Sequence, residues 1–236
     1  MTYKFTSDIR QSYAYIVPGK FKGGYDPNRN YLENRTKTAI AFISNCKRPR
    51  LRAARKLKKY IDVDIYGKCG KRCKPNCFSL LPKYKFYLAF ENAVCEDYIT
   101  EKTYRNAFTN DIVPVIISGA NLSNPEVVPP NSSINGLDFK RAVDLADYLK
   151  KIGSDPQLYN RFFKWRDEWS IIDGGTYRVP CDVCNKLYEP MQYFHHPAVT
   201  FGRNSFHVNC ALSQLDDFLL DLEWGGLDLE EPKEAQ

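Results

Sequence analysis

The chain has 236 residues, 43% of them hydrophobic, so it can bury a core as one domain or as two small ones. Its formal net charge is +6, and no apolar run approaches the roughly 18 to 20 residues that a membrane span requires. The first residues, MTYKFTSDIR, lack the apolar centre of a signal peptide. These features favour a soluble globular protein over a membrane-spanning one.

From Thr38 onward, strand patterns alternate with helix patterns. TAIAFIS is a continuous apolar run, Leu51, Ala54 and Leu57 recur at helical spacing, and IDVDIYG is again extended. KFYLAFEN predicts a third strand, TEKTYRNAF a helix with Thr100 as its N-cap, and IVPVIIS a fourth strand. This alternation predicts an α/β fold with a Rossmann-like parallel sheet and flanking helices.

Two further helices are expected to close the core. DFKRAVDLADYLKKIG carries an apolar stripe that ends at Gly153. The next helix is expected to start at Asp155-Pro156, a cap followed by proline, and to carry Trp165 and Trp169. The segment before Thr38 is rich in Tyr, Gly, Pro and Asn, and is expected to be loop or linker.

The loops that follow the strands carry candidate binding residues. Ligands of open parallel sheets bind beyond the carboxyl ends of the strands, where Arg50 follows the first strand and Asn92, Tyr98, Glu101 and Lys102 follow the third. A helix starting near Thr100 would add its dipole, so these residues predict a site for a diphosphate. The alternative for Glu101 and Lys102 is an ordinary charged first turn. Gly-rich phosphate loops are absent from the sequence.

Basic residues crowd one segment, which indicates either a phosphate-bearing partner or a solvated helix face: Arg50, Arg52, Arg55, Lys56, Lys58 and Lys59. Nucleic acid is not the expected partner, because neither interleaved aromatics nor a known module accompanies these charges.

Eight cysteines and three Asn-x-Ser/Thr acceptors, at Asn34, Asn121 and Asn131, favour an oxidising, glycosylating compartment. Because no signal accompanies them, the true N-terminus is expected upstream of Met1.

A rival interpretation comes from the C-terminal cysteines. Cys181-x-x-Cys184 and His207-x-x-Cys210 have the spacing of a structural zinc site, which would suit a zinc-stabilised basic module that binds nucleic acid.

Several of these segments occur in an order that resembles a known family. YKFYLAFEN, DYITEK, NAF, VPVI, LADYL, LYNRFFKWR and CDVC resemble the GDP-fucose-dependent α1,3-fucosyltransferases of the animal and plant Golgi, over Thr2 to Tyr188. The resemblance implies the C-terminal, donor-binding lobe of a GT-B type glycosyltransferase. The chain would then comprise a linker and remnant of the N-terminal lobe at 1–37, a GDP-fucose-binding Rossmann-like domain at 38–190 and a divergent acidic tail at 191–236.

The resemblance also implies a reaction and a set of residue roles. L-fucose would pass from GDP-fucose to N-acetylglucosamine of a glycoprotein or glycolipid glycan with inversion, and no metal or other cofactor would be essential. Arg50 and Lys102 match residues that contact the diphosphate, and Glu101 matches one that binds the ribose. Asn92 and Tyr98 would shape the donor pocket. Tyr87 is a weaker match, because an aromatic in that strand could equally belong to the core.

Further expectations concern what the chain lacks. The general base of the family lies before the segment that MTYKFTSDI resembles, so the catalytic base is expected upstream of Met1 and this chain is expected to be weakly active or inactive alone. A Golgi membrane location, lumenal side, would depend on an anchor that is absent here. The resemblance implies disulfides from Cys181 and Cys184 to cysteines of the N-terminal part, which would lie before Met1, so in this chain the two are expected to be without those partners. A catalytically dead, donor-binding relative is the remaining alternative.

One motif is expected to mislead. Asp62-x-Asp64 resembles the metal-binding Asp-x-Asp of other glycosyltransferases, but the two acids alternate along a strand and are expected to face solvent or sheet neighbours.

Overall fold

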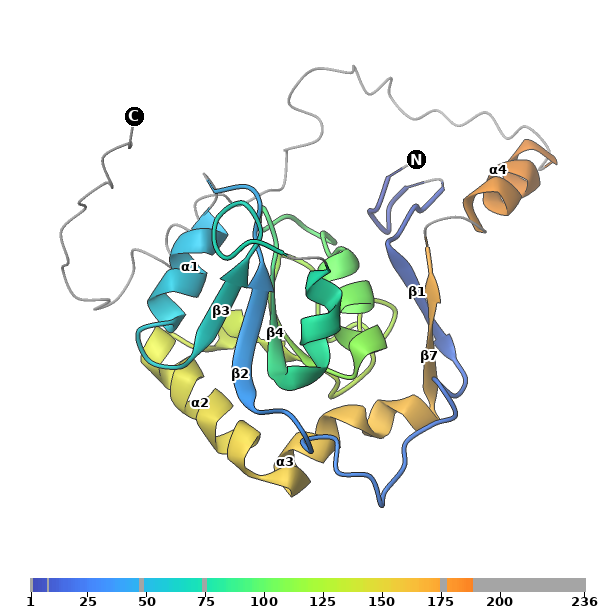
Figure 1. The fold of residues 1–236 in the computed structure, drawn as a ribbon. Helices are drawn as coiled ribbons and strands as arrows, with labels where there is room; N and C mark the ends of the chain where they lie inside the picture. The colour runs from blue at the N-terminus through green and yellow to red at the C-terminus, as the bar shows by residue number, and fades with distance from the viewer. Residues whose placement is uncertain (1, 8, 47–48, 74–75, 175–177, 189–236) are drawn as a thin grey trace.

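The computed structural model describes residues 2–7, 9–46, 49–73, 76–174 and 178–188. Its centre is a five-stranded sheet in the order β3-β2-β4-β5-β6, with every neighbouring pair parallel (Figure 1). The strands are β2 (Lys37–Phe42), β3 (Val63–Tyr66), β4 (Tyr84–Phe90), β5 (Val113–Ile117) and β6 (Ile134–Asn135). The four strands predicted from apolar runs are confirmed, whereas the two-residue β6 is too short to give a periodic signal.

Both faces of this sheet are covered, which explains why its strands are largely apolar. One face packs through Ala39, Phe86 and Leu88 against three helices, α1 (Pro49–Leu57), α2 (Ala142–Ser154) and α3 (Pro156–Asn160). The other face packs through Ile40 and Tyr87 against the short helix η2 (Lys102–Ala107) and a separate two-stranded ribbon. The predicted α/β fold is therefore confirmed.

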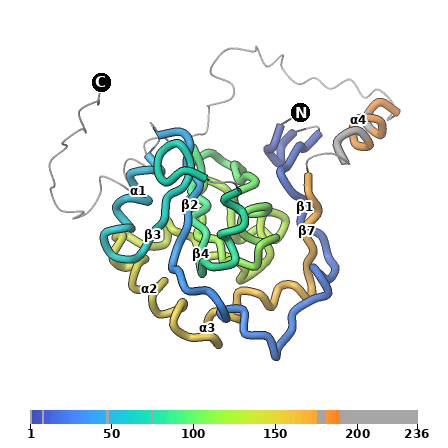
Figure 2. The backbone as a smooth tube through the Cα atoms, in the orientation of Figure 1, coloured from blue at the N-terminus to red at the C-terminus, as the bar shows by residue number. Residues whose placement is uncertain are grey.

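The ribbon joins segments that lie far apart in the sequence. β1 (Ala14–Pro18) pairs antiparallel with β7 (Trp169–Asp173), and the two run side by side in Figures 1 and 2. The expectation of loop or linker before Thr38 therefore missed a strand, and Trp169 begins β7 instead of lying on a helix. Each strand has five residues and a distant partner, so neither gives a strong local pattern.

The predicted start of α3 is confirmed in detail. The Asp155 carboxylate accepts the backbone N–H groups of Gln157 at 2.8 Å and Leu158 at 3.1 Å, and Pro156 fills the first helical position. Helix α2 continues through Ser154, one residue beyond the expected stop. The chain then tightens into the short helix η5 (Arg161–Asp167), which carries the buried Trp165.

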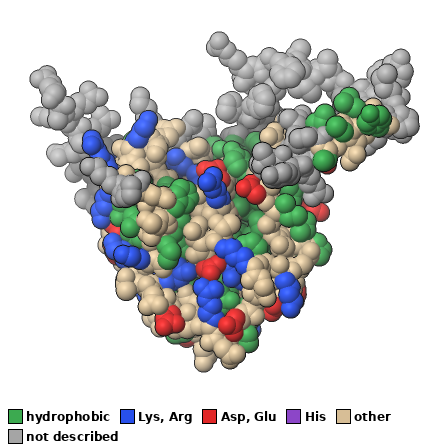
Figure 3. All heavy atoms as spheres, turned by 45° about the vertical axis from the view of Figure 1, so that its right-hand side comes forward, with side chains coloured by type: hydrophobic (Ala, Val, Ile, Leu, Met, Phe, Trp, Pro, Cys, Tyr) green, Lys and Arg blue, Asp and Glu red, His purple; other side chains and the backbone are tan. Residues whose placement is uncertain are grey.

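The remaining short elements are η1 (Cys77–Lys83), η3 (Phe108–Asn110), η4 (Gly136–Asp138) and α4 (Arg178–Tyr188). Within the described ranges, no helix has both the length and the apolar character needed to cross a membrane. On the face that carries the ribbon, basic, acidic and apolar side chains are interspersed, so charge alone does not mark a site there (Figure 3).

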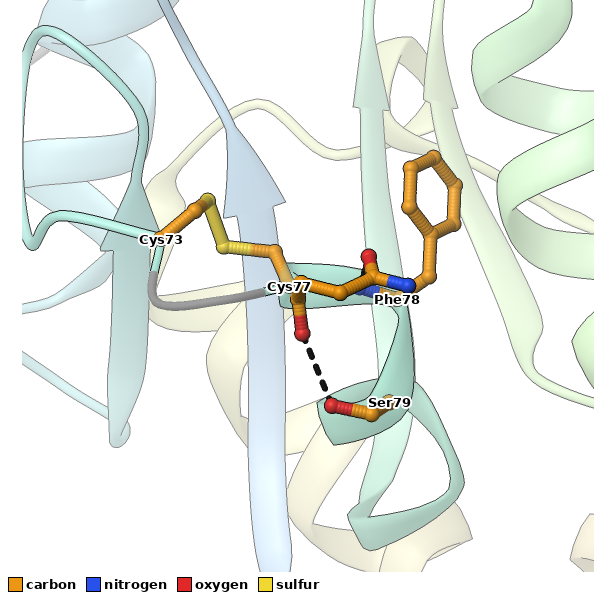
Figure 4. The surroundings of a disulfide bond; sticks show 5 residues. Cys73, Cys77, Phe78 and Ser79 are labelled. Atoms are coloured by element: carbon orange, nitrogen blue, oxygen red, sulfur yellow. Dashed lines mark hydrogen bonds between the residues drawn. A yellow bond between two sulfur atoms is a disulfide. The ribbon is translucent and has the colours of Figure 1, made fainter.

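Two disulfides in which both cysteines are described fasten the loops at one end of the sheet. Cys46, just before α1, is bonded to Cys69 after β3, and Cys73 is bonded to Cys77 at the start of η1 (Figure 4). Both links confirm that cysteines of this chain form disulfides. Neither pairing was predicted, because sequence spacing does not reveal which cysteines meet in space.

Candidate nucleotide-sugar site

Five of the six predicted site residues gather at the carboxyl-terminal edge of the sheet. Arg50 lies in the first turn of α1, which follows β2, whereas Asn92, Tyr98, Glu101 and Lys102 follow β4. Strands β2 and β4 are hydrogen-bonded neighbours, so the segments that leave them emerge side by side. The rule that ligands bind beyond the carboxyl ends of parallel strands therefore selected candidate residues that the fold brings to one edge of the sheet.

Lys102 is held in a buried ion pair with Glu91, the residue directly after β4. Its Nζ donates to Glu91 Oε2 at 2.7 Å and to Thr100 Oγ1 at 2.7 Å. The Glu91 side chain is 0% exposed, and burial raises its pKa while Lys102 acts in the opposite direction. A lysine ammonium has three donors, and Glu101 Oε1 lies 3.6 Å from the Lys102 Nζ, close enough for an ion pair but beyond a good hydrogen bond, so the third N–H can still donate to a further partner.

Thr100 does not cap the helix as the sequence predicted. Its hydroxyl donates to Glu91 Oε1 at 2.8 Å, and its backbone N–H donates to the same oxygen at 2.9 Å. Helix η2 is a wide π-type turn of six residues, and Glu101 before it makes no side-chain cap. Because η2 is so short, it aligns few peptide dipoles. Attraction for an anion must therefore come mainly from the side-chain cations.

Arg50, unlike Lys102, is a buried cation that no carboxylate pairs with among the described residues. It is 5% exposed, and its buried Nε has no hydrogen-bond partner. In the described part of the chain, its guanidinium makes no ion pair. Burial lowers its pKa and Glu91 partly offsets that effect, but an arginine stays charged at neutral pH. A buried cation without a partner is costly, so Arg50 marks a place where an anion would be stabilised.

The loop that carries Asn92 and Tyr98 is fixed by contacts with the end of β5. Ser118 Oγ donates to the Tyr98 carbonyl at 2.5 Å, and a Cβ on Gly119 would lie 2.5 Å from the Cys95 carbonyl, so only glycine allows this approach. Burial raises the pKa of the half-buried Tyr98, and Asn92 Oδ1 is buried without a partner. The loop thus presents a second unsatisfied polar group near Arg50.

Glu101 faces an open cleft beside these buried groups. Its side chain is 46% exposed, and it lines a hollow of 730 Å³ between η2 and the β1–β7 ribbon. Tyr3, Tyr13 and Tyr104 also line this cleft, whereas Arg50 and Lys102 do not. The cleft therefore adjoins the two cations without containing them.

Tyr87 is placed in the core behind the site. It is 0% exposed, its hydroxyl accepts the Asn106 side-chain amide at 2.8 Å, and its ring meets the edge of Phe42. Burial is the main reason that its pKa is raised. This placement agrees with the alternative that the strand aromatic belongs to the core, and a direct contact with the donor stays a prediction.

Glu91 is the functional candidate that sequence reasoning missed. A carboxylate directly after a buried parallel strand was a usable signal, because that position points to the ligand edge of the sheet. The sequence pattern favoured Asn92 and the charged pair Glu101-Lys102 instead. The Glu91 carboxylate accepts hydrogen bonds from both Lys102 and Thr100, so it positions the Lys102 ammonium.

The Asp-x-Asp motif has a structural explanation. Asp62 is exposed, whereas Asp64 is 4% exposed and accepts Lys37 Nζ at 2.7 Å, Lys71 Nζ at 2.5 Å and the Tyr84 hydroxyl at 2.5 Å. Its pKa is lowered by these partners despite burial. Among the residues that the structure describes, no group of three or more His, Cys, Asp or Glu side chains could hold a metal ion.

The remaining candidates lie away from this edge. Cys181 and Cys184 are exposed on α4, and His207 and Cys210 lie outside the described residues, so the disulfide and zinc hypotheses stay predictions. The sequon residues are all exposed, which glycosylation requires: Asn34, Asn121 and Asn131.

Comparison with known proteins gives a consistent set of relatives. The chain is 42% identical over 172 residues to glycoprotein 3-alpha-L-fucosyltransferase A of Drosophila melanogaster, covering 69% of this chain and 33% of that protein. It is 33% identical over 196 residues to the human 3-galactosyl-N-acetylglucosaminide 4-alpha-L-fucosyltransferase, covering 82% of this chain and 54% of that protein. The chain thus spans about a third to a half of these relatives' length.

A solved structure supports the fold. A crystal structure of an α1,3-fucosyltransferase with GDP-fucose matches with a TM-score of 0.52 and 21% identity, over 70% of this chain and 51% of that one. This likeness bears on the fold and agrees with the predicted C-terminal lobe of a GT-B type enzyme. Residues 32–199 match the C-terminal model of glycosyltransferase family 10 (fucosyltransferase), and the chain belongs to that family.

Proposed function

We propose that this chain binds GDP-fucose and serves the transfer of L-fucose, with inversion, to N-acetylglucosamine of a glycan on a glycoprotein or glycolipid. Family membership supports the reaction class. The observation that carries the proposal is the buried Arg50, whose Nε has no hydrogen-bond partner, near the Glu91–Lys102 pair. Departure of GDP leaves negative charge on the phosphates, and fixed cations aimed at that charge stabilise the transition state more than the ground state.

In this proposal, Arg50 and the remaining N–H of Lys102 bind the diphosphate, and Glu101 binds the ribose. Asn92 and Tyr98 shape the pocket. Arg50 and Lys102 are 5% and 7% exposed, so a phosphate that reaches them is shielded from water and its attraction to them is strengthened.

Calorimetric titration of GDP tests the donor site. Arg50→Ala and Lys102→Ala should each weaken binding by about 10-fold to 150-fold, the cost of losing a charge-assisted hydrogen bond. Arg55→Ala is the matched control, since Arg55 is exposed one turn further along α1 and should leave affinity unchanged. Unchanged affinity in both site variants would overturn the assignment.

A second part of the proposal concerns transfer. The general base is proposed to lie outside these residues, so the 236-residue chain should bind GDP-fucose but transfer little fucose to an N-glycan or lactosamine acceptor. Transfer by this chain at an ordinary enzymatic rate would contradict the proposal that the general base lies elsewhere.

The sequons and disulfides support a proposed lumenal location in the Golgi, which immunolocalisation of the epitope-tagged natural protein would test.

A further inference from the structure

We propose that a second hollow, at the opposite edge of the sheet from the donor site, binds an anionic saccharide such as a sulfated or uronic-acid-bearing sugar unit. The hollow has a volume of 550 Å³ and lies between the C-terminal half of α2 and the α3–η5 segment. Small-ligand sites typically measure about 300–1,000 Å³, so one or two sugar rings fit. Six lining residues carry the argument: Asn131, Tyr148, Lys151, Arg161, Phe162 and Lys164.

The two sites lie at opposite edges of the sheet. Asn131 precedes β6, so it belongs to the amino-terminal edge, whereas Arg50 and Lys102 lie beyond the carboxyl ends of β2 and β4. None of the proposed donor-binding residues lines the hollow. The proposal therefore goes beyond the proposed function, and either can fail without the other.

The charge of the hollow is the first argument. Lys151, Arg161 and Lys164 line it together, and its lining contains no acidic residue. Within the described residues, none of these three makes an ion pair. Their neighbours on and before α2 behave differently: Arg141 pairs with Asp144 at 2.6 Å, and Lys150 pairs with Asp147 at 2.9 Å. Three like charges around one concave surface attract an anion more strongly than single charges on a convex surface.

The other lining groups identify the class of anion. Tyr148 is 36% exposed and Phe162 is partly buried, so both rings offer apolar surface to a ligand. Asn131 supplies an amide when it carries no glycan. Rings, hydroxyl-binding groups and cations together suit a sugar that carries sulfate or carboxylate, whereas a bare inorganic anion would leave the rings unused. Nucleic acid needs a longer basic track than this hollow provides.

A calorimetric titration of the 236-residue chain with a heparin-derived disaccharide tests the proposal. The protein should be made in a bacterial periplasm, where disulfides form and the sequon at Asn131 carries no glycan. Arg161→Ala with Lys164→Ala should weaken binding at least about tenfold, because two charge-assisted contacts are lost. The matched control is Arg141→Ala with Lys150→Ala, which removes the same net charge from ion-paired positions and should change affinity less than about twofold.

Several results would overturn the proposal. Equal losses in the two double variants would show attraction by net charge alone. A loss in Arg52→Ala with Lys59→Ala, without a loss in the Arg161–Lys164 variant, would move binding to the basic helix α1. Competition by GDP would place the disaccharide in the donor site, and equally tight binding of inorganic phosphate would show that no sugar is recognised. Arg161 and Lys164 are exposed, so their loss should spare folding, which thermal melting checks.

Discussion

Replacing Arg50 and Lys102 by methionine should shift the stability of the protein in opposite directions, although both changes weaken GDP binding. Methionine keeps much of the apolar volume of either side chain, so the charge is the main difference. Arg50 is buried with an unpartnered Nε, and losing such a cation should stabilise the free protein by about 1–3 kcal/mol. The melting temperature should rise by about 2–4 °C for each kcal/mol.

Lys102→Met leaves the Glu91 carboxylate, 0% exposed, without its cation, and this should cost about 3–5 kcal/mol. The loss should depend on pH with a definite sign. Burial raises the pKa of Glu91 above its ordinary 4.5, and removing Lys102 raises it further, so the folded state favours the protonated acid. The contribution of Glu91 to the stability of the variant should therefore be fully present below pH 4.5 and be lost as the pH rises through the folded-state pKa.

Urea unfolding at pH 5 and pH 8, with GDP titration on the same samples, measures both effects. Arg55→Met is the control for loss of a cation from α1, and its exposure predicts a change within about 0.5 kcal/mol. If Arg50→Met and Lys102→Met lower the unfolding free energy by similar amounts, then Arg50 has a partner in solution. In that case Arg50 does not mark an unoccupied anion site.

Three further outcomes concern stability. The lowered pKa of Asp64 implies stability that is present above pH 3.8 and lost below it, so in acid titrations Asp64→Asn should reduce the pH slope by up to about 1.4 kcal/mol per unit. Asp111→Ala leaves Arg166, 2% exposed, without its carboxylate and should cost about 3–5 kcal/mol in urea unfolding; less than about 1 kcal/mol would contradict the pairing. Replacing Cys46 and Cys69 by serine should lower stability by about 3 kcal/mol, and an unchanged melting temperature would show that the link is dispensable.

Local patterns determined most of the sheet and much of the site. Four of its strands follow from apolar runs, the start of α3 follows from Asp155-Pro156, and Arg50 and Lys102 follow from the rule that ligands bind beyond parallel strands. Each of these signals lies within about a dozen neighbouring residues, so no knowledge of distant contacts was needed.

Tertiary structure decided how those residues interact. Thr100 is a good helix cap in isolation, yet the buried Glu91 carboxylate claims its hydroxyl and N–H and leaves η2 without a side-chain cap. The β1–β7 ribbon pairs segments about 150 residues apart, and its strands acquire a partner only when the chain closes. Folding also distinguishes Arg50 from Lys102: it places the buried Glu91 carboxylate against the lysine, which already has Glu101 beside it in the sequence, whereas it buries the Arg50 Nε without a hydrogen-bond partner.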